Sequence, residues 1–417
     1  MKKISKLSLV AAITLASITT ISSANESLSD AFTNGKVKGQ IKAMYSDSNF
    51  LGNTKSDDIS VLGGSLGYTT GSFYGLSAGA TFQTSHVLSE DNNNNVFVGD
   101  LDASGSVLSE AYLEYQLANT NIKAGRQFIF TPLVSTAIDG KSSESLLKDS
   151  FEAYMLTNTD IPNTTISIGY ISKYLAKTNG TGDVGKSNDF SQTHSFSAIP
   201  INGTTSHDDA YTILLKNNSI ENLILQAQYL KINEETTSKD INITYLQADY
   251  TIANQTLSAQ YIKSKNDNQP SGQEDGAAFG FKATGPLGIS NLGYLVAFNS
   301  NTEDGDVNTG MGAGTNDTLF TSIPVNGGGV PARANTDTLV GAIVLPIAGI
   351  TTIGYLGHSW SNDMVGDVLA TGAMAIYPIN KNTLLKVNYE HVELENTFGP
   401  IVEGNTDVTR VYLSYKF

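Results

Sequence analysis

The chain ends in "RVYLSYKF" (residues 410–417), where apolar and polar side chains alternate up to the last residue. Val411, Leu413, Tyr415 and Phe417 share one parity, and Arg410, Tyr412, Ser414 and Lys416 share the other. A period of two predicts a β-strand with one apolar and one polar face. Because terminal residues usually fray, we expect a neighbouring strand to hold this one in place.

The same alternation recurs along the whole chain. It is clearest in "KVKGQIKAMY" (36–45), "LSAGATFQ" (76–83), "LILQAQY" (223–229) and "TLLKVNYEHVE" (383–393). We find no convincing amphipathic helix after the first 24 residues. The sequence therefore predicts an all-β protein.

Short and long connections alternate between these runs. The short turns are 71–75, 118–121, 158–164, 217–222, 253–255, 285–291, 346–350 and 377–382, and the longer polar connections include 88–107, 178–207, 268–275 and 305–335. This alternation is typical of an outer-membrane barrel with tight periplasmic turns and long extracellular loops. It predicts a closed antiparallel transmembrane β-barrel of about 18 strands, from 36–48 to 406–417. We expect labels in 88–107 and 305–335 to be accessible on intact cells.

Composition narrows the function. The chain has 417 residues, a formal net charge of -15 and no cysteine, which excludes a disulfide framework and thiol catalysis. Charged residues make up 16%, against about 25% in soluble domains. Nucleic acid is not expected as a partner, because phosphate binding needs clustered lysine and arginine.

The N-terminus reads as a secretory signal peptide over residues 1–24, with Lys2, Lys3 and Lys6 before an apolar stretch and Ala24 at the cleavage site. The longest later apolar run, 339–350, is interrupted by Pro346 and is shorter than the roughly 20 residues of a membrane helix. Residues 25–417 are thus expected to form a single barrel domain in the bacterial outer membrane, surrounded by lipid and lipopolysaccharide.

The barrel explains the patterned end of the chain. The last strand must pair with the first so that no sheet edge remains in lipid. Tyr415 and Phe417 would then lie in the periplasmic aromatic girdle. A terminal aromatic strand also resembles the assembly signal of outer-membrane barrels, which implies recognition by the barrel-assembly machinery.

Several blocks resemble the OprD-like outer-membrane porins: "DAFTNGKVKGQIKAMY" (30–45), "LSEAYLEYQLANTNIKAGRQFIFTPLV" (108–134), "FEAYMLTN" (151–158) and the aromatic end. The resemblance implies an 18-stranded monomeric barrel and passive uptake of small hydrophilic solutes; a homotrimer is left open. It also implies that a loop near 131–150 folds inward as the constriction, with Asp139, Lys141, Glu144, Lys148 and Asp149 as its charges. The alternative is an ordinary exposed loop.

Strand parity points a basic strip into the lumen, consisting of Lys38, Lys42, Lys386 and Arg410. Counting from the strand ends, we expect Lys42 and Arg410 to lie at similar depth. Lys123 adds an inward cation, whereas Arg126 has the other parity. Such a strip would favour solutes that carry a carboxylate; alternatively, the lysines hydrate the wall and pair with loop acids.

Three further possibilities remain open. In "GHSWSND" (357–363), His358 lies near Ser359 and Ser361, which allows a phospholipase-like barrel enzyme, although Gly-x-Ser-x-Gly is absent. A surface adhesin or receptor would also use long loops. Calcium could bind the acidic stretches 303–310 or 99–104, although neither has EF-hand spacing.

Overall fold

The computed structural model describes residues 27–49, 56–91, 93–94, 97, 101–102, 104–175, 196–197, 206–207, 209–233, 240–266, 275–289, 291–323, 331–361, 367–394 and 404–417. The expected signal peptide, 1–24, lies outside the described residues. In the described part of the chain, no helix is long and apolar enough to cross a membrane.

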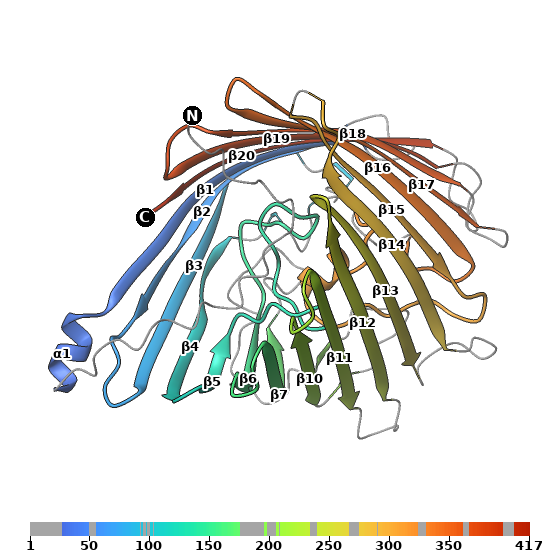
Figure 1. Ribbon diagram of the computed structural model, residues 1–417. Coiled ribbons are helices and arrows are strands. Elements are labelled where there is room, and N and C mark those ends of the chain that lie inside the picture. Colours follow the sequence, from blue (N-terminus) through green and yellow to red (C-terminus); the bar gives the residue numbers. More distant parts are fainter. Residues whose placement is uncertain are drawn as a thin grey trace.

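Eighteen strands form one antiparallel sheet that closes on itself (Figure 1). They are β1 (Lys36–Asn49), β2 (Asp57–Thr69), β3 (Leu76–Asp91), β4 (Gly105–Leu117), β5 (Thr120–Gln127), β6 (Ser150–Asn158), β7 (Thr164–Leu175), β10 (Asp209–Asn217), β11 (Leu223–Asn233), β12 (Ile241–Ile252), β13 (Gln255–Asn266), β14 (Gly276–Pro286), β15 (Gly293–Asn301), β16 (Thr336–Ile347), β17 (Ile350–Ser361), β18 (Val368–Pro378), β19 (Thr383–Leu394) and β20 (Gly404–Lys416). Each strand pairs with its neighbours in chain order, and β20 pairs with β1. The predicted barrel and its strand number are confirmed.

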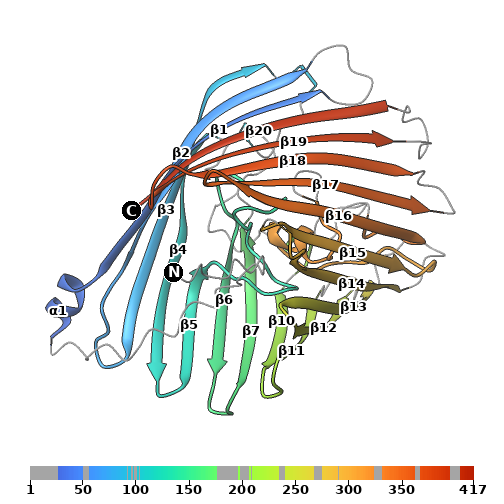
Figure 2. The same cartoon turned by 45° about the horizontal axis from the view of Figure 1, so that its top comes forward.

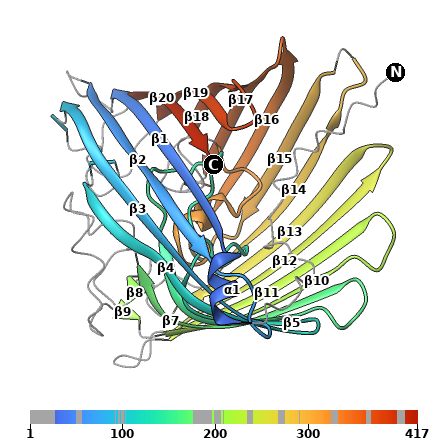
Figure 3. The same cartoon turned by 90° about the vertical axis from the view of Figure 1, so that its left-hand side faces the viewer.

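One end of the barrel carries only short turns, and we call it the turn end; the opposite end is the loop end. All eight predicted short turns lie at the turn end. Ala253–Asn254 and Ala348–Gly349 have positive φ at both residues (48° and 65°, 48° and 86°), the geometry that suits two-residue hairpins. The short helix α1 (Leu28–Thr33) precedes β1 at the same end (Figure 3), and a small hairpin, β8 (Phe196–Ser197) with β9 (Ser206–His207), is separate from the barrel sheet.

The two parities of each strand face different surroundings. On β1, Val37 and Ile41 are 59% and 54% exposed, whereas Lys42 and Ser46 are 3% and 0% exposed. A band of exposed leucine, isoleucine, phenylalanine and tyrosine side chains continues around the barrel. So much exposed apolar surface is unfavourable in water and suits a lipid environment.

The last strand is held from both sides. Phe417 and Gly39 exchange backbone hydrogen bonds of 2.9 and 3.0 Å, and the N–H of Lys416 donates to the carbonyl of Asn382 at 2.8 Å. The Phe417 ring lies over Gly39, at a position that a Cβ atom would occupy. The rings of Tyr415 and Phe417 are 6.1 Å apart and exposed on the outer face. Pairing with β1 therefore accounts for the alternation up to the last residue.

Candidate functional site

Two connections that the structure describes at length fold into the lumen. The first, inner loop 1 (residues 128–149), joins β5 to β6; the second, inner loop 2 (residues 302–323), follows β15. Figures 1 and 2 show both inside the ring of strands. Inner loop 1 spans the lumen, because Lys148 exchanges hydrogen bonds of 2.9 and 3.0 Å with Gln83 of β3, while the N–H of Leu133 donates to Gln228 of β11 at 2.9 Å. Between β3 and β4, Phe97 and Leu101 are also buried against inward residues of β1, β2 and β20, so the expectation that 88–107 is an exposed loop is wrong at these two residues.

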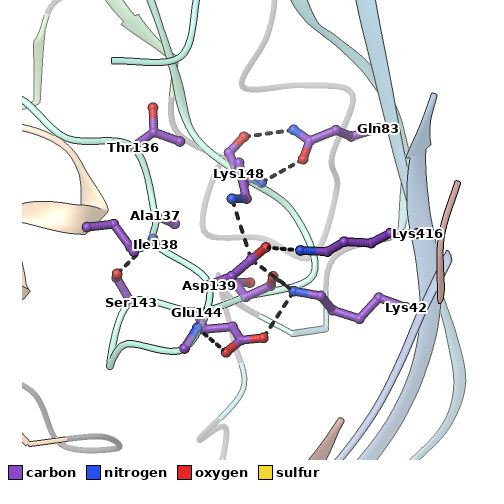
Figure 4. A network of polar contacts seen from close by, with 12 residues as sticks. Lys42, Gln83, Thr136, Ala137, Ile138, Asp139, Ser143, Glu144, Lys148 and Lys416 are labelled. Carbon is purple, nitrogen blue, oxygen red and sulfur yellow. Dashed lines mark hydrogen bonds and ion pairs between the residues drawn. The ribbon is translucent and has the colours of Figure 1, made fainter. Parts of the chain in front are cut away.

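Carboxylates of inner loop 1 bridge the seam at which the barrel closes (Figure 4). Lys42 of β1 lies 3.2 Å from Glu144 and 3.2 Å from Asp139, measured from its Nζ to the nearer carboxylate oxygen of each. Glu144 also pairs with Lys386 of β19, and Asp139 pairs with Lys416 of β20 at 3.5 Å. Two carboxylates thus connect the three strands β19, β20 and β1.

This seam cluster consists of Lys42, Asp139, Glu144, Lys148, Lys386 and Lys416. Lys42 and Lys386 are each 3% exposed, so their charges need partners within the protein. Lys386 also lies 3.9 Å from the centre of the Tyr412 ring. Four ammonium groups face two carboxylates, which leaves a formal excess of two positive charges.

The loop carboxylates are strongly stabilised in their charged form. Burial alone would raise the pKa of Asp139, but Lys42, Lys148 and Lys416 outweigh it and lower that pKa well below its ordinary value. Burial likewise opposes ionisation of Glu144, and Lys42 and Lys386 lower its pKa. Both carboxylates are therefore ionised at neutral pH.

Inner loop 2 packs along inner loop 1 through three alternate glycines, Gly310, Gly312 and Gly314. A Cβ atom at Gly310 would overlap the carbonyl of Leu133. The N–H of Met311 donates to that carbonyl at 3.0 Å, and Met311 in turn accepts from the N–H of Ser135 at 3.0 Å. The two backbones can approach this closely only because glycine has no side chain.

Two buried or half-buried aspartates join the inner loops. Asp149 is 1% exposed and accepts from the N–H groups of Ala137 and Ala313 at 2.8 and 2.9 Å. Asp317 accepts from the hydroxyl groups of Ser142 and Ser143 at 2.7 and 2.6 Å. The two loops consequently form one cross-linked unit.

The expectation that 305–335 is an exposed loop is wrong for the part described, because Val307, Met311 and Leu319 are at most 4% exposed. They belong to an apolar cluster with Leu133, Val134 and inward residues of β6 to β14. This side of the inner wall is apolar near the loop end, and hydrophobic burial holds the inner loops there. At the seam, ion pairs hold inner loop 1 against the wall instead.

The remaining predicted site residues are dispersed. Lys38 is exposed near the turn end and lies beside Gly67, and Lys141 is exposed on inner loop 1. Lys123 pairs with Glu110 at 3.7 Å and contacts the Tyr112 ring. Arg126 is buried against Glu152 at 3.0 Å and does not join the seam cluster.

The expectation that Lys42 and Arg410 lie at similar depth is wrong. Lys42 is opposite Ser414, whereas Arg410 is opposite Ser46, four positions nearer the loop end. The cause is the stagger of the closing pair: Lys416 aligns with Gln40, so the two strand ends are not level.

Sequence reasoning missed several residues that position the inner loops. Gln83 and Gln228 are buried glutamines on inward parity, and only their tertiary contacts reveal their role. The alternate glycines 310, 312 and 314 were a visible signal for close packing. Lys282 of β14 was also missed; its ammonium group lies 4.0 Å from the centre of the Phe320 ring of inner loop 2.

The candidate serine–histidine pair is divided between the two faces of β17. His358 contacts Asp367 at 3.4 Å and the Trp360 ring on the outer face. Ser359 is buried on the inner face and hydrogen-bonds Thr338 at 2.9 Å. Within the described residues, which include only part of 99–104, no group of three or more histidine or acidic side chains is placed to hold a metal ion.

The fold has many structural relatives of low sequence identity. Over 93% of this chain and 98% of that chain, Pseudomonas aeruginosa OpdO superposes with a TM-score of 0.72 and 14% identity. The fold is that of the OprD-like outer-membrane porins. OccAB1 of Acinetobacter baumannii gives a TM-score of 0.70 at 13% identity, covering 93% of this chain and 97% of its own. OccK2 (OpdF) of Pseudomonas aeruginosa, solved in complex with glucuronate, gives a TM-score of 0.68 at 12% identity, covering 93% of this chain and 98% of its own.

The resemblance of the sequence to OprD-like porins is thus confirmed at the level of the fold. No protein-family model matches the sequence, and no curated protein matches it. A closed barrel of this fold, with an apolar exterior, is an outer-membrane structure. The turn end accordingly faces the periplasm and the loop end faces outward.

Proposed function

We propose that the protein is a passive outer-membrane channel for small hydrophilic solutes, and that its constriction favours solutes with a carboxylate. Eighteen strands enclose a lumen wide enough for an aqueous path. The two inner loops narrow it. The observation that carries the proposal is the seam cluster, whose four ammonium groups exceed its two carboxylates at the edge of inner loop 1.

The lysines of this cluster have separate roles in the proposal. Lys42 and Lys386 are buried and paired with Glu144, so we assign them to holding inner loop 1 and not to direct contact with solute. Lys148 and Lys416 are 22% and 60% exposed in their side chains, so their charge reaches the lumen. Solutes would meet these two groups.

Lys282 adds a cation on the opposite wall. It faces inward from β14 and forms no ion pair with any residue that the structure describes. Its contact with the Phe320 ring of inner loop 2 supports a role for Lys282 in the narrowed region. The glucuronate bound by OccK2, which has the same fold, is a carboxylate-bearing solute and supports this preference. No step of the proposal requires catalysis.

Ion currents through the purified protein in planar bilayers test this proposal. Lys282→Gln should move the reversal potential in a salt gradient toward cations and slow the flux of small carboxylates relative to neutral sugars. Lys216→Gln makes the same charge change on the inner parity of β10 near the turn end and should have a smaller effect. Equal effects of the two substitutions, or none, would refute the placement of selectivity at the inner loops.

A further inference from the structure

The short helix α1 lies outside the ring of strands at the turn end, just before the first strand. Figures 1 and 2 show it beyond the ends of β1 and β2. The hydroxyl of Ser27 accepts from the N–H of Asp30 at 3.0 Å and caps the helix. The N–H of Gly71, in the turn between β2 and β3, donates to the carbonyl of Ala31 at 2.8 Å. The helix is therefore a fixed part of the barrel.

An outward side chain of the wall joins α1 to the lipid-facing surface. Tyr68 of β2 has the same parity as Leu62 and Leu66, which are 41% and 54% exposed on the outer face. Its hydroxyl donates to the carbonyl of Phe32, and its ring occupies the position that a Cβ atom of Gly35 would take. Tyrosine at the edge of a lipid-facing band is typical of the aromatic girdle. α1 thus borders this girdle on the outer side of the wall.

The side chains of α1 divide into two faces. The apolar face consists of Leu28, Ala31 and Phe32, and the polar face consists of Ser29, Asp30 and Thr33. Ala31 is 2% exposed, whereas Leu28 and Phe32 are 58% and 56% exposed. The apolar face therefore contacts the barrel through its smallest member and leaves two large apolar side chains exposed.

Isoleucines extend the exposed apolar surface around the turn end. Ile161, Ile220 and Ile289 are 53%, 55% and 64% exposed. Each begins a turn in which its carbonyl accepts from the N–H three residues later, at 3.0, 3.1 and 2.9 Å. In each turn, an asparagine two positions after the isoleucine has a positive φ (57°, 61° and 59°). One turn geometry thus presents the same aliphatic side chain between β6 and β7, between β10 and β11, and between β14 and β15.

These exposed side chains fit a lipid environment better than water. The eight short turns contain only three charged residues, which are Asp160, Glu221 and Lys381. The apolar face of α1 is also continuous with the lipid-facing band, because Val37 and Ile41 of β1 follow on the outer face at 59% and 54% exposure. Amphipathic helices at membrane surfaces bury their apolar face about 5–10 Å into the boundary between headgroups and acyl chains. A large apolar patch beside such a band indicates contact with membrane.

We propose that α1 and the isoleucine-bearing turns lie in the headgroup layer of the periplasmic leaflet, with Leu28 and Phe32 inserted toward the acyl chains. Phospholipid is then the partner of the apolar face of α1. The helix anchors β1, the strand that closes the barrel with β20, at the membrane surface. This placement is independent of the proposed channel function.

Spin labels test the placement, because the chain has no cysteine of its own. Phe32→Cys and Asp30→Cys put a nitroxide on opposite faces of α1 in separate proteins. Each protein is folded into phosphatidylethanolamine–phosphatidylglycerol vesicles and exposed in turn to oxygen, which concentrates in the bilayer, and to a water-soluble nickel chelate. The ratio of the oxygen to the nickel collision rate should be several-fold higher at position 32 than at position 30. It should approach the ratio for Ile41→Cys on lipid-facing β1, and Leu28→Cys should behave as Phe32→Cys does.

A second pair of labels tests the turns. Ile220→Cys and Glu221→Cys are neighbours in one turn, and the ratio should be higher at position 220. Heat-modifiable migration establishes that each labelled barrel is folded. Equal ratios at positions 32 and 30 would overturn lipid as the partner of α1, and equal ratios at 220 and 221 would overturn the placement of the turns. The channel function would stand in both cases, since it is measured separately as ion current.

Discussion

Glu144 and Lys42, 102 positions apart in the chain, meet inside the barrel with Oε1 and Nζ 3.2 Å apart and both side chains buried. Glu144 binds Lys386 of β19 at the same time. One carboxylate of a connecting loop thus links the strands on both sides of β20, which closes the barrel. Constriction of the lumen and closure of the barrel are structurally coupled through this residue.

Glu144→Ala should release inner loop 1. The substitution leaves the buried Lys386 without a carboxylate partner among the described residues and leaves Lys42 with Asp139 alone. An unpaired buried charge costs about 3–5 kcal/mol, so we expect the loop to leave the wall and admit water. The single-channel conductance should rise clearly above that of the unmodified protein. The control is the triple variant Glu144→Leu, Lys42→Met, Lys386→Met, in which no buried charge is left unpaired and the conductance should return toward the original value. An unchanged conductance in Glu144→Ala would show that these ion pairs do not hold the loop.

The same pairs predict a dependence on pH. The pKa values of Asp139 and Glu144 are lowered in the docked loop relative to 3.8 and 4.5 for the free groups. The ion pairs therefore stabilise the docked loop fully at a pH above the pKa values of the free groups. This stabilisation is lost as the pH falls through the lowered pKa values of the docked loop. Conductance should stay constant from pH 7 to 4.5 and should rise only below about pH 4. A rise centred above pH 5 would contradict the assignment, and Glu144→Ala should already be open at pH 7.

The end of the chain should be essential for assembly. Deleting Phe417 removes two backbone hydrogen bonds to Gly39 and the ring that covers it, so folded, heat-modifiable barrel in the membrane should fall several-fold. Gly39→Val should have a similar effect, because a side chain there displaces the ring. Gly341→Val is the matched control, since its added atoms point into open space. Normal barrel levels after Phe417 deletion would refute a role for this residue in closure.

The inward course of inner loop 2 can be tested by labelling, because the chain has no cysteine of its own. Cysteine in place of Glu303, which is exposed at the start of the connection, should react with an impermeant maleimide on intact cells. Cysteine in place of Thr315, which is 0% exposed, should not react in the folded protein. A cysteine replacing Asn380 in a periplasmic turn should react only after the outer membrane is broken. Rapid labelling at position 315 on cells would place inner loop 2 outside the lumen.

Local sequence patterns were sufficient to predict the strands and turns of the barrel, but not the arrangement of the loops inside it. Parity and turn spacing depend on neighbouring residues, so the strands, all eight turns and the closing role of Phe417 could be predicted from sequence. The pairing of Glu144 with Lys386, 242 positions away, depends on how the loop crosses the lumen, and no local pattern encodes that distance. The predicted depth of Arg410 was wrong because the stagger between β1 and β20 is a property of the closed sheet. The polar composition of inner loop 2 predicts an exposed loop, and the close-packing signal of Gly310, Gly312 and Gly314 is hidden within it.

The most direct test of the central claim is the single-channel current of the purified, folded protein in a planar bilayer. We predict stepwise, ohmic conductance from the unmodified chain, with larger steps from Glu144→Ala under the same conditions. Folded protein that inserts without any conductance would contradict the account of this barrel as a channel narrowed by its inner loops.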